Sequence, residues 1–230
     1  MRTLRSIHNQ SELAYISVPI TSGKTLYDEL LKTTVSEESR NFLTGPASSL
    51  VKSMRIPEYN EIIERVISIN RRKGLEFLDE LKGRLEKPIL FPGDLYPRGE
   101  SWSNDDFQAL WMTLIGEKCS EIHMCKGWEY SNGATEEFTH AYQLRLGIPK
   151  SLDTSPFFNT KEREKDERER MRNIQVYNHE GKSLSIEEGM TKINKILPLL
   201  KENLFNTQSL ESSISLLEWT SEMITQGFYQ

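Results

Sequence analysis

The sequence predicts an α/β protein in which helices flank a parallel sheet and a helical extension follows. Three short apolar segments have the length and composition of buried strands. Segments with helical periodicity separate them, and this alternation is typical of a parallel sheet covered by helices. After residue 152, charged and amphipathic segments replace the alternation. The apolar segments are residues 13–20, 88–92 and 121–125.

The first domain is expected over residues 1–152, with a polar, partly helical insertion at about residues 23–56. Its first strand, residues 13–20, is rich in β-forming side chains, and Pro19 marks its end. A short helix is expected over residues 25–31, at the start of the insertion.

A long helix is expected to begin at Pro57, because proline is pre-organised for the first helical position. Its apolar stripe reaches Leu81, and Gly74 is a potential interruption. The strand at residues 88–92 follows and ends at a proline and a glycine.

The next helix is expected over residues 105–118, with Ser103 or Asn104 as its cap. We expect Cys119 at the end of this helix and Cys125 in the following strand, so a disulfide between them is not expected. Reduced thiols are typical of the cytoplasm, which is the location we expect.

The C-terminal part, residues 153–230, begins with a charged linker. Residues 161–172 are almost entirely charged, which fits either a solvated helix or a disordered segment. Two amphipathic helices are expected further on, and their apolar stripes need a partner, either the same chain or a second copy. The expected elements are a strand at residues 174–177, a turn at 178–181, and helices at about 185–203 and 208–226.

Composition excludes several classes of partner. The net charge of −5 gives no general attraction to a nucleic acid polymer. No apolar run approaches the roughly 20 residues of a membrane span, so no membrane partner is expected. The four histidines are scattered without the spacing of a zinc site, and we expect neither a metal nor a cofactor.

A candidate site lies where the third strand meets the next helix, over residues 127–137. Ligands in open α/β sheets bind at the carboxyl ends of strands, beside helix N-termini. Ser131 or Asn132 can cap the helix, and Gly133 lets a ligand approach the backbone. In the purely structural alternative, these residues only cap the helix, and the acidic pair that follows is stabilised by the helix dipole.

That acidic pair is Glu136 and Glu137, whose side chains point about 100° apart, so one of them is expected to face the sheet. A second Gly-containing turn, at Gly23, resembles the end of a phosphate-binding loop. The glycine that such a loop needs five residues earlier is Val18, so no ATP site is expected. Gly23 then either contacts a phosphate or serves an ordinary turn.

Residues 127–137 resemble a motif of the nucleoside 2-deoxyribosyltransferase-like superfamily, in which a catalytic Glu follows a Gly by four residues. Residues 15–20 and 88–93 resemble the first two strands of that fold, and the resemblance covers roughly residues 12–150. It implies a Rossmann-like (flavodoxin-like) sheet. It also implies cleavage of an N-glycosidic bond in a nucleotide or nucleoside, and a homodimer or higher homo-oligomer.

The resemblance makes Glu137 the nucleophile, consistent with the role of carboxylates in glycoside cleavage. It makes Ser131 and the Gly133 backbone the contacts to a 5'-phosphate. Relatives carry an Asp at the position of Met112, and Asp105 or Asp106, about two turns earlier, is the expected substitute. The expected substrate-binding residues are Ser17, Pro19, Gly23, Trp128, Ser131, Asn132 and Gly133.

Three alternatives remain open at this point. The pocket can sense a nucleotide without turning it over, which the absence of an Asp at Met112 favours. The protein can cleave a dinucleotide such as NAD, with the insertion enlarging the pocket. A structural role predicts that Glu137 is buried in a closed turn.

Overall fold

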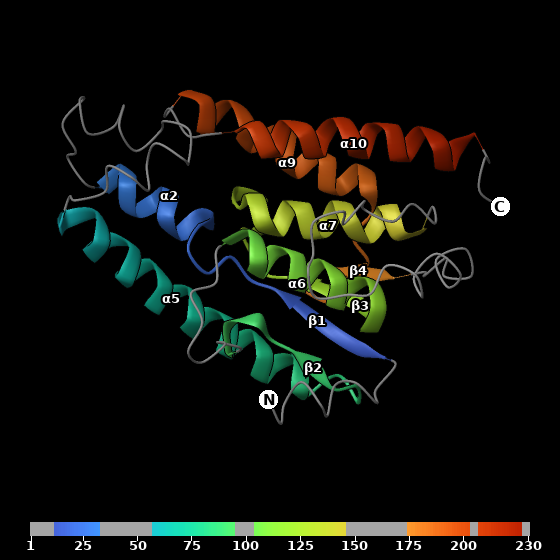
Figure 1. The fold of residues 1–230 in the computed structure, drawn as a ribbon, viewed down its shortest axis with the longest axis horizontal. Helices are drawn as coiled ribbons and strands as arrows, with labels where there is room; N and C mark the ends of the chain where they lie inside the picture. The colour runs from blue at the N-terminus through green and yellow to red at the C-terminus, as the bar shows by residue number, and fades with distance from the viewer. Residues whose placement is uncertain (1–11, 33–56, 95–103, 146–173, 203–206, 227–230) are drawn as a thin grey trace.

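The computed structural model describes residues 12–32, 57–94, 104–145, 174–202 and 207–226, and its ribbon is shown in Figure 1. The described strands form one sheet of four, all parallel, in the order β2-β1-β3-β4. This arrangement confirms the expected Rossmann-like α/β fold with a helical C-terminal part. The strands are β1 (Leu13–Ser17), β2 (Ile89–Leu90), β3 (Cys119–Met124) and β4 (Gln175–Tyr177).

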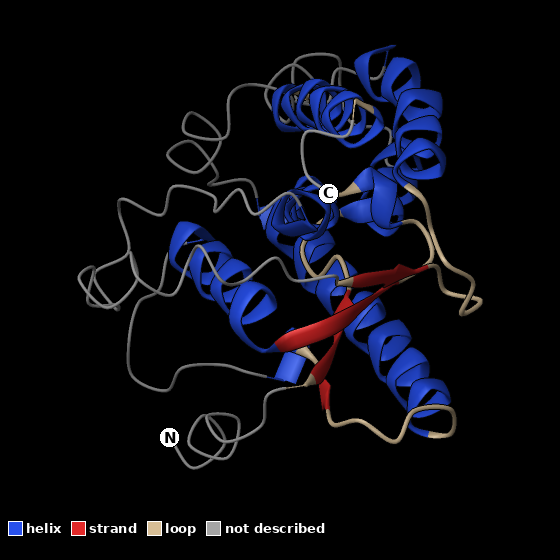
Figure 2. Ribbon diagram, turned by 90° about the vertical axis from the view of Figure 1, so that its right-hand side faces the viewer, coloured by secondary structure: helices blue, strands red, loops and turns tan. Residues whose placement is uncertain are grey.

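Helices lie on both sides of the strands (Figure 2). Between β1 and β2 come α2 (Gly23–Lys32) and α5 (Pro57–Lys82), and β2 leads into the short 3-10 helix η1 (Pro92–Asp94). The remaining helices are α6 (Asn104–Lys118), η2 (Trp128–Tyr130), α7 (Asn132–Arg145), α9 (Ile186–Glu202) and α10 (Gln208–Thr225).

The two faces of β1 enter different cores, because side chains alternate along a strand. Leu13 and Tyr15 belong to the larger core, which includes buried residues of α6, α7, α9 and α10. Ile16 points the other way, into a smaller core with Phe77 and Leu81 of α5. The sheet therefore separates α5 from the remaining long helices, and Tyr15 faces α7.

The helix expected from Pro57 is present as α5, and it continues past Gly74 without interruption. Gly74 serves close packing instead. A Cβ atom there would lie 2.7 Å from the Phe91 ring, so the absence of a side chain lets α5 approach the residue that follows β2.

The expected places of both cysteines are wrong. Cys119 is the first residue of β3 and not the end of a helix, and Cys125 follows the strand. The pairing of Leu13 with Cys119 draws this residue into the sheet. Both thiols are free and buried.

The C-terminal part is joined closely to the sheet. The expected strand is present as β4 and pairs with β3, and Gly181 in the following turn has a positive φ of 81°. The apolar stripes of α9 and α10 are covered by the same chain, since Ile193, Leu210 and Leu217 are buried in the larger core. The division at residue 152 stays a prediction.

Two expected features fall outside the described residues: the greater part of the insertion, from residue 33 to 56, and the charged run at 161–172. Among the described helices, none is long and apolar enough to span a membrane. No group of three or more His, Cys, Asp or Glu side chains in the described parts of the chain could hold a metal ion.

Candidate active site

The strand order places a binding position at the carboxyl ends of β1 and β3. The chain passes from β1 to β2 on one side and then to β3 on the other, so the strand order reverses at β1. In open parallel sheets, ligands bind in the crevice outside the strand ends at such a point. Ser17 ends β1, Met124 ends β3, and the turn before α7 lies directly after β3.

Glu137 of α7 points toward β1 and is held there by two hydroxyl groups. The Tyr15 hydroxyl donates a hydrogen bond to one carboxylate oxygen at 2.6 Å, and the Ser17 hydroxyl donates to the other at 2.6 Å. Glu137 is only 7% exposed. Short hydrogen bonds to an ionised acceptor are among the stronger ones in proteins, so the orientation of the carboxylate is fixed by the strand.

Burial raises the pKa of Glu137 from its ordinary 4.5 to about 7. The hydrogen bonds from Ser17 and Tyr15 oppose this shift, whereas the charge of Glu136 adds to it. The pKa of Tyr15 is raised well above its ordinary value, first by burial and then by the charge of Glu137. Near neutral pH, Glu137 therefore populates both protonation states, which suits a group that exchanges protons or attacks as a carboxylate.

Ser131 is the cap of α7, which settles the choice between Ser131 and Asn132. Its side-chain oxygen accepts a hydrogen bond from the backbone N–H of Ala134 at 3.3 Å, and Asn132 is the first residue of the helix. The same oxygen lies 2.9 Å from the hydroxyl oxygen of Ser22, just before α2. The N-termini of α2 and α7 therefore meet at a pair of hydroxyl groups, where backbone N–H groups favour an anion.

Gly23 is required by the turn that joins β1 to α2. Its φ is +79°, and a Cβ atom would lie 2.6 Å from the side chain of Pro19, which is buried. The close contact between Gly23 and Pro19 gives both residues a role in the turn. Their expected role in substrate binding stays a prediction.

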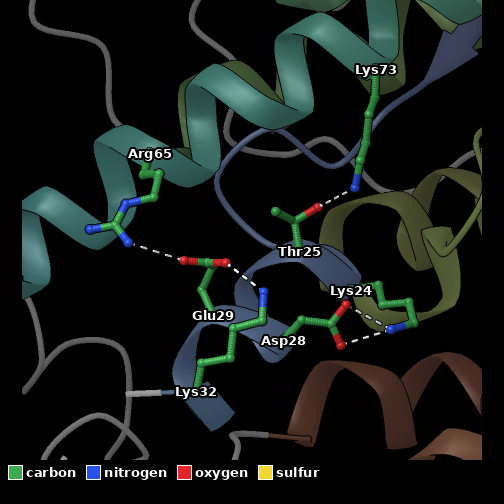
Figure 3. A network of polar contacts seen from close by, with 7 residues as sticks. All are labelled: Lys24, Thr25, Asp28, Glu29, Lys32, Arg65 and Lys73. Carbon is green, nitrogen blue, oxygen red and sulfur yellow. Dashed lines mark hydrogen bonds and ion pairs between the residues drawn. The ribbon is translucent and has the colours of Figure 1, made fainter.

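Polar contacts lie within α2 and between α2 and α5 (Figure 3). The Lys24 ammonium lies 2.7 Å from Asp28, and Arg65 of α5 lies 3.3 Å from Glu29. Lys73, also on α5, donates to the Thr25 hydroxyl at 2.9 Å. Exposed ion pairs contribute little to stability, and only the contacts of Arg65 and Lys73 join α2 to α5.

The structure places Trp128 in the core, 3% exposed, with its ring centroid 4.8 Å from that of Phe138. In this arrangement the indole packs against α7, and stacking on a substrate base is not supported. Met112, at the position where the resemblance implies an Asp, is also in the core, and its carbonyl oxygen lies 3.1 Å from a ring nitrogen of His140.

The two aspartates offered as substitutes do not gain support. Asp106 is half-buried on α6, and the side chain of Asp105 lies outside the described residues. Their expected catalytic role stays a prediction. Gly133 lies in the first turn of α7 and faces Gln108 of α6. A Cβ atom at Gly133 would lie 3.4 Å from the side-chain oxygen of Gln108.

Sequence reasoning missed three polar residues of this site: Tyr15, Ser22 and Gln108. For Tyr15 a signal existed, because Tyr15 and Ser17 are two apart on a strand and must face the same side. Gln108 donates to Glu136 at 3.2 Å across two helices, and no local pattern in the sequence indicates that contact.

Fold and site together define a Rossmann-like α/β protein with a buried carboxyl at its topological switch point. No protein-family profile, curated protein or solved structure matches this chain.

Proposed function

We propose that the protein cleaves the N-glycosidic bond of a nucleotide or nucleoside, with a 5'-monophosphate as the favoured substrate. The observation that carries this proposal is the Glu137 carboxyl, held by Tyr15 and Ser17 at the carboxyl end of β1. Carboxylates are the nucleophiles and charge stabilisers that glycosidic cleavage needs.

In this mechanism a Glu137 oxygen attacks the anomeric carbon, and the base departs with the electron pair of the C–N bond. Tyr15 and Ser17 aim the carboxylate and disperse its charge through their hydroxyl groups. Water then attacks the same carbon and releases the sugar from Glu137. Transfer of the sugar to another base is the less favoured outcome of this second step. The N-terminus of α7 and the Ser131 hydroxyl are the groups for a 5'-phosphate.

The test is release of free base, followed by chromatography, from nucleoside monophosphates, nucleosides and NAD. Glu137→Gln keeps the size of the side chain and removes the nucleophile, so we expect loss of release. Glu117→Gln on α6 is the matched control, since it removes a half-buried carboxyl elsewhere in the same helical layer. Nicotinamide release alone would assign the dinucleotide reaction, and no release from any compound contradicts the proposal.

Nucleotide sensing without turnover is a second candidate, favoured by one observation. Both oxygens of Glu137 are occupied by hydroxyl groups of β1, and the residue is nearly buried, as a structural role also requires. A ligand that raises the unfolding temperature without product formation supports sensing.

A cytoplasmic location and a homo-oligomer complete the proposal, and sedimentation analysis tests the oligomer.

A further inference from the structure

The second glutamate of the acidic pair is held in place by another helix. The Gln108 side-chain amide on α6 donates a hydrogen bond to a Glu136 carboxylate oxygen at 3.2 Å. Gln108 is half-buried, and its own oxygen lies against Gly133 in the first turn of α7. The contact therefore joins the N-terminal parts of α6 and α7, at the edge of the sheet that carries the site.

Glu136 also interacts electrostatically with Glu137. Its charge is one of the causes that raise the pKa of Glu137, so the two carboxyl groups lie within electrostatic reach. They face different elements, because one is bound by α6 and the other by β1. Glycosidic cleavage uses two carboxyl groups in different surroundings, with one group acting on the sugar and one on the proton.

The position where the resemblance implies a second carboxyl is Met112, which carries none and is 1% exposed in the core. Gln108 is four residues before Met112 and therefore lies on the same face of α6, one turn closer to the helix N-terminus. It carries an amide, and that amide holds a carboxylate from α7 in place.

We propose that Glu136 is the second catalytic carboxylate of this site and that Gln108 is the residue that positions it. The inference rests on the proposed N-glycosidase function and names the group that handles the proton in it.

The proposed step is the release of the sugar from Glu137. In the first half of the reaction, a bond forms between a Glu137 oxygen and the anomeric carbon while the C–N bond breaks, and the departing base takes a proton from solvent. In the second half, the Glu136 carboxylate takes a proton from water as the water oxygen bonds to the anomeric carbon. Glu137 leaves as a carboxylate, and Glu136 returns its proton to solvent.

The test compares the first turnover with later ones in Glu136→Gln. We expect a burst of one base per active site, followed by a steady rate lowered by about 10²–10⁴-fold, the usual contribution of general acid–base catalysis. Intact-protein mass should show the glycosyl group on the protein, and azide, which needs no proton removed, should restore turnover. Glu136→Asp, which keeps a carboxylate on a shorter arm, should retain more turnover than Glu136→Gln.

Gln108→Leu tests the positioning role, since Glu136 remains in the chain without its partner. We expect the same burst and partial rescue by azide, which a merely structural loss would not produce. Glu117→Gln should keep steady turnover. A folded Glu136→Gln variant that turns over within about threefold of the parent, or that shows no burst, overturns the role of Glu136 and leaves the N-glycosidase intact. If the parent itself releases no base, both proposals fail.

Discussion

Replacing Glu137 with glutamine should stabilise the folded protein, and only at neutral and alkaline pH. The carboxyl is buried, and its folded-state pKa of about 7 lies above the ordinary 4.5. A group with a raised folded pKa contributes stability that is fully present below the unfolded pKa and lost as pH rises through the folded one. The window for this residue is therefore about pH 4.5 to 7.

The magnitude follows from the two pKa values. A tenfold change in a proton equilibrium is worth about 1.4 kcal/mol, so moving the pKa from 4.5 to about 7 corresponds to about 3 kcal/mol. Glutamine carries no charge at any pH in this range and keeps an oxygen that accepts a hydrogen bond from Tyr15 or Ser17. We expect parent and variant to differ by less than about 1 kcal/mol near pH 5 and by about 2–3 kcal/mol, in favour of the variant, at pH 8.

Urea unfolding of both proteins at pH 5 and pH 8 measures the two differences, with the slope m checked for equality. Glu117→Gln in parallel reports the general effect of exchanging a glutamate in the same layer of helices. If the difference in unfolding free energy between parent and Glu137→Gln is the same at both pH values, Glu137 does not have a raised pKa in the folded protein.

Three further predictions concern packing and the site. Gly189→Ala should lower the free energy of unfolding in urea by about 1–3 kcal/mol, because its methyl group would overlap the ring of Phe138. Gly116→Ala has 3.6 Å to its nearest neighbour and should raise the free energy of unfolding by up to about 1 kcal/mol through helix propensity. Equal effects of the two substitutions would contradict this packing. Ser17→Ala should move the pKa of Glu137 upward, because a hydrogen bond that lowers it is lost; carbon-13 NMR of the carboxyl reports the change, and a downward shift would refute the assignment. Arg145→Lys should lower stability by about 1–2 kcal/mol in thermal unfolding, because two guanidinium N–H groups share the carbonyl oxygen before β4; unchanged stability would show that one donor suffices.

The sequence was sufficient for the elements whose signals are local. Pro57 predicted the start of α5, and a short apolar run predicted β4. Signals that depend on distant neighbours were misread. Gly74 suggested an interruption of α5, but the glycine is required by the ring of Phe91, which follows β2 and is distant from Gly74 in the sequence.

The site divides in the same way. Glu137 and Ser131 could be proposed because the turn and its helix are contiguous in the sequence, and the spacing of the resembled motif favours Glu137 over Glu136. The partners of Glu137 come from a strand more than a hundred residues earlier, and their role appears only once the sheet places β1 beside α7. The position of Trp128 beside the turn did not indicate which way its ring points. The ring lies in the core, and the expected contact of Trp128 with a substrate stays a prediction.

The placement of α9 has a consequence for how the protein is made. Gly189 lies against the ring of Phe138, the neighbour of Glu137, and β4 completes the sheet beside β3. On the ribosome, the strand and helix that carry Tyr15 and Glu137 emerge well before these later segments. Until they arrive, the larger core is incomplete and α7 lacks its covering helices. The core around Phe138, next to Glu137 in the sequence, is therefore complete only after the last third of the protein has been synthesised and packed.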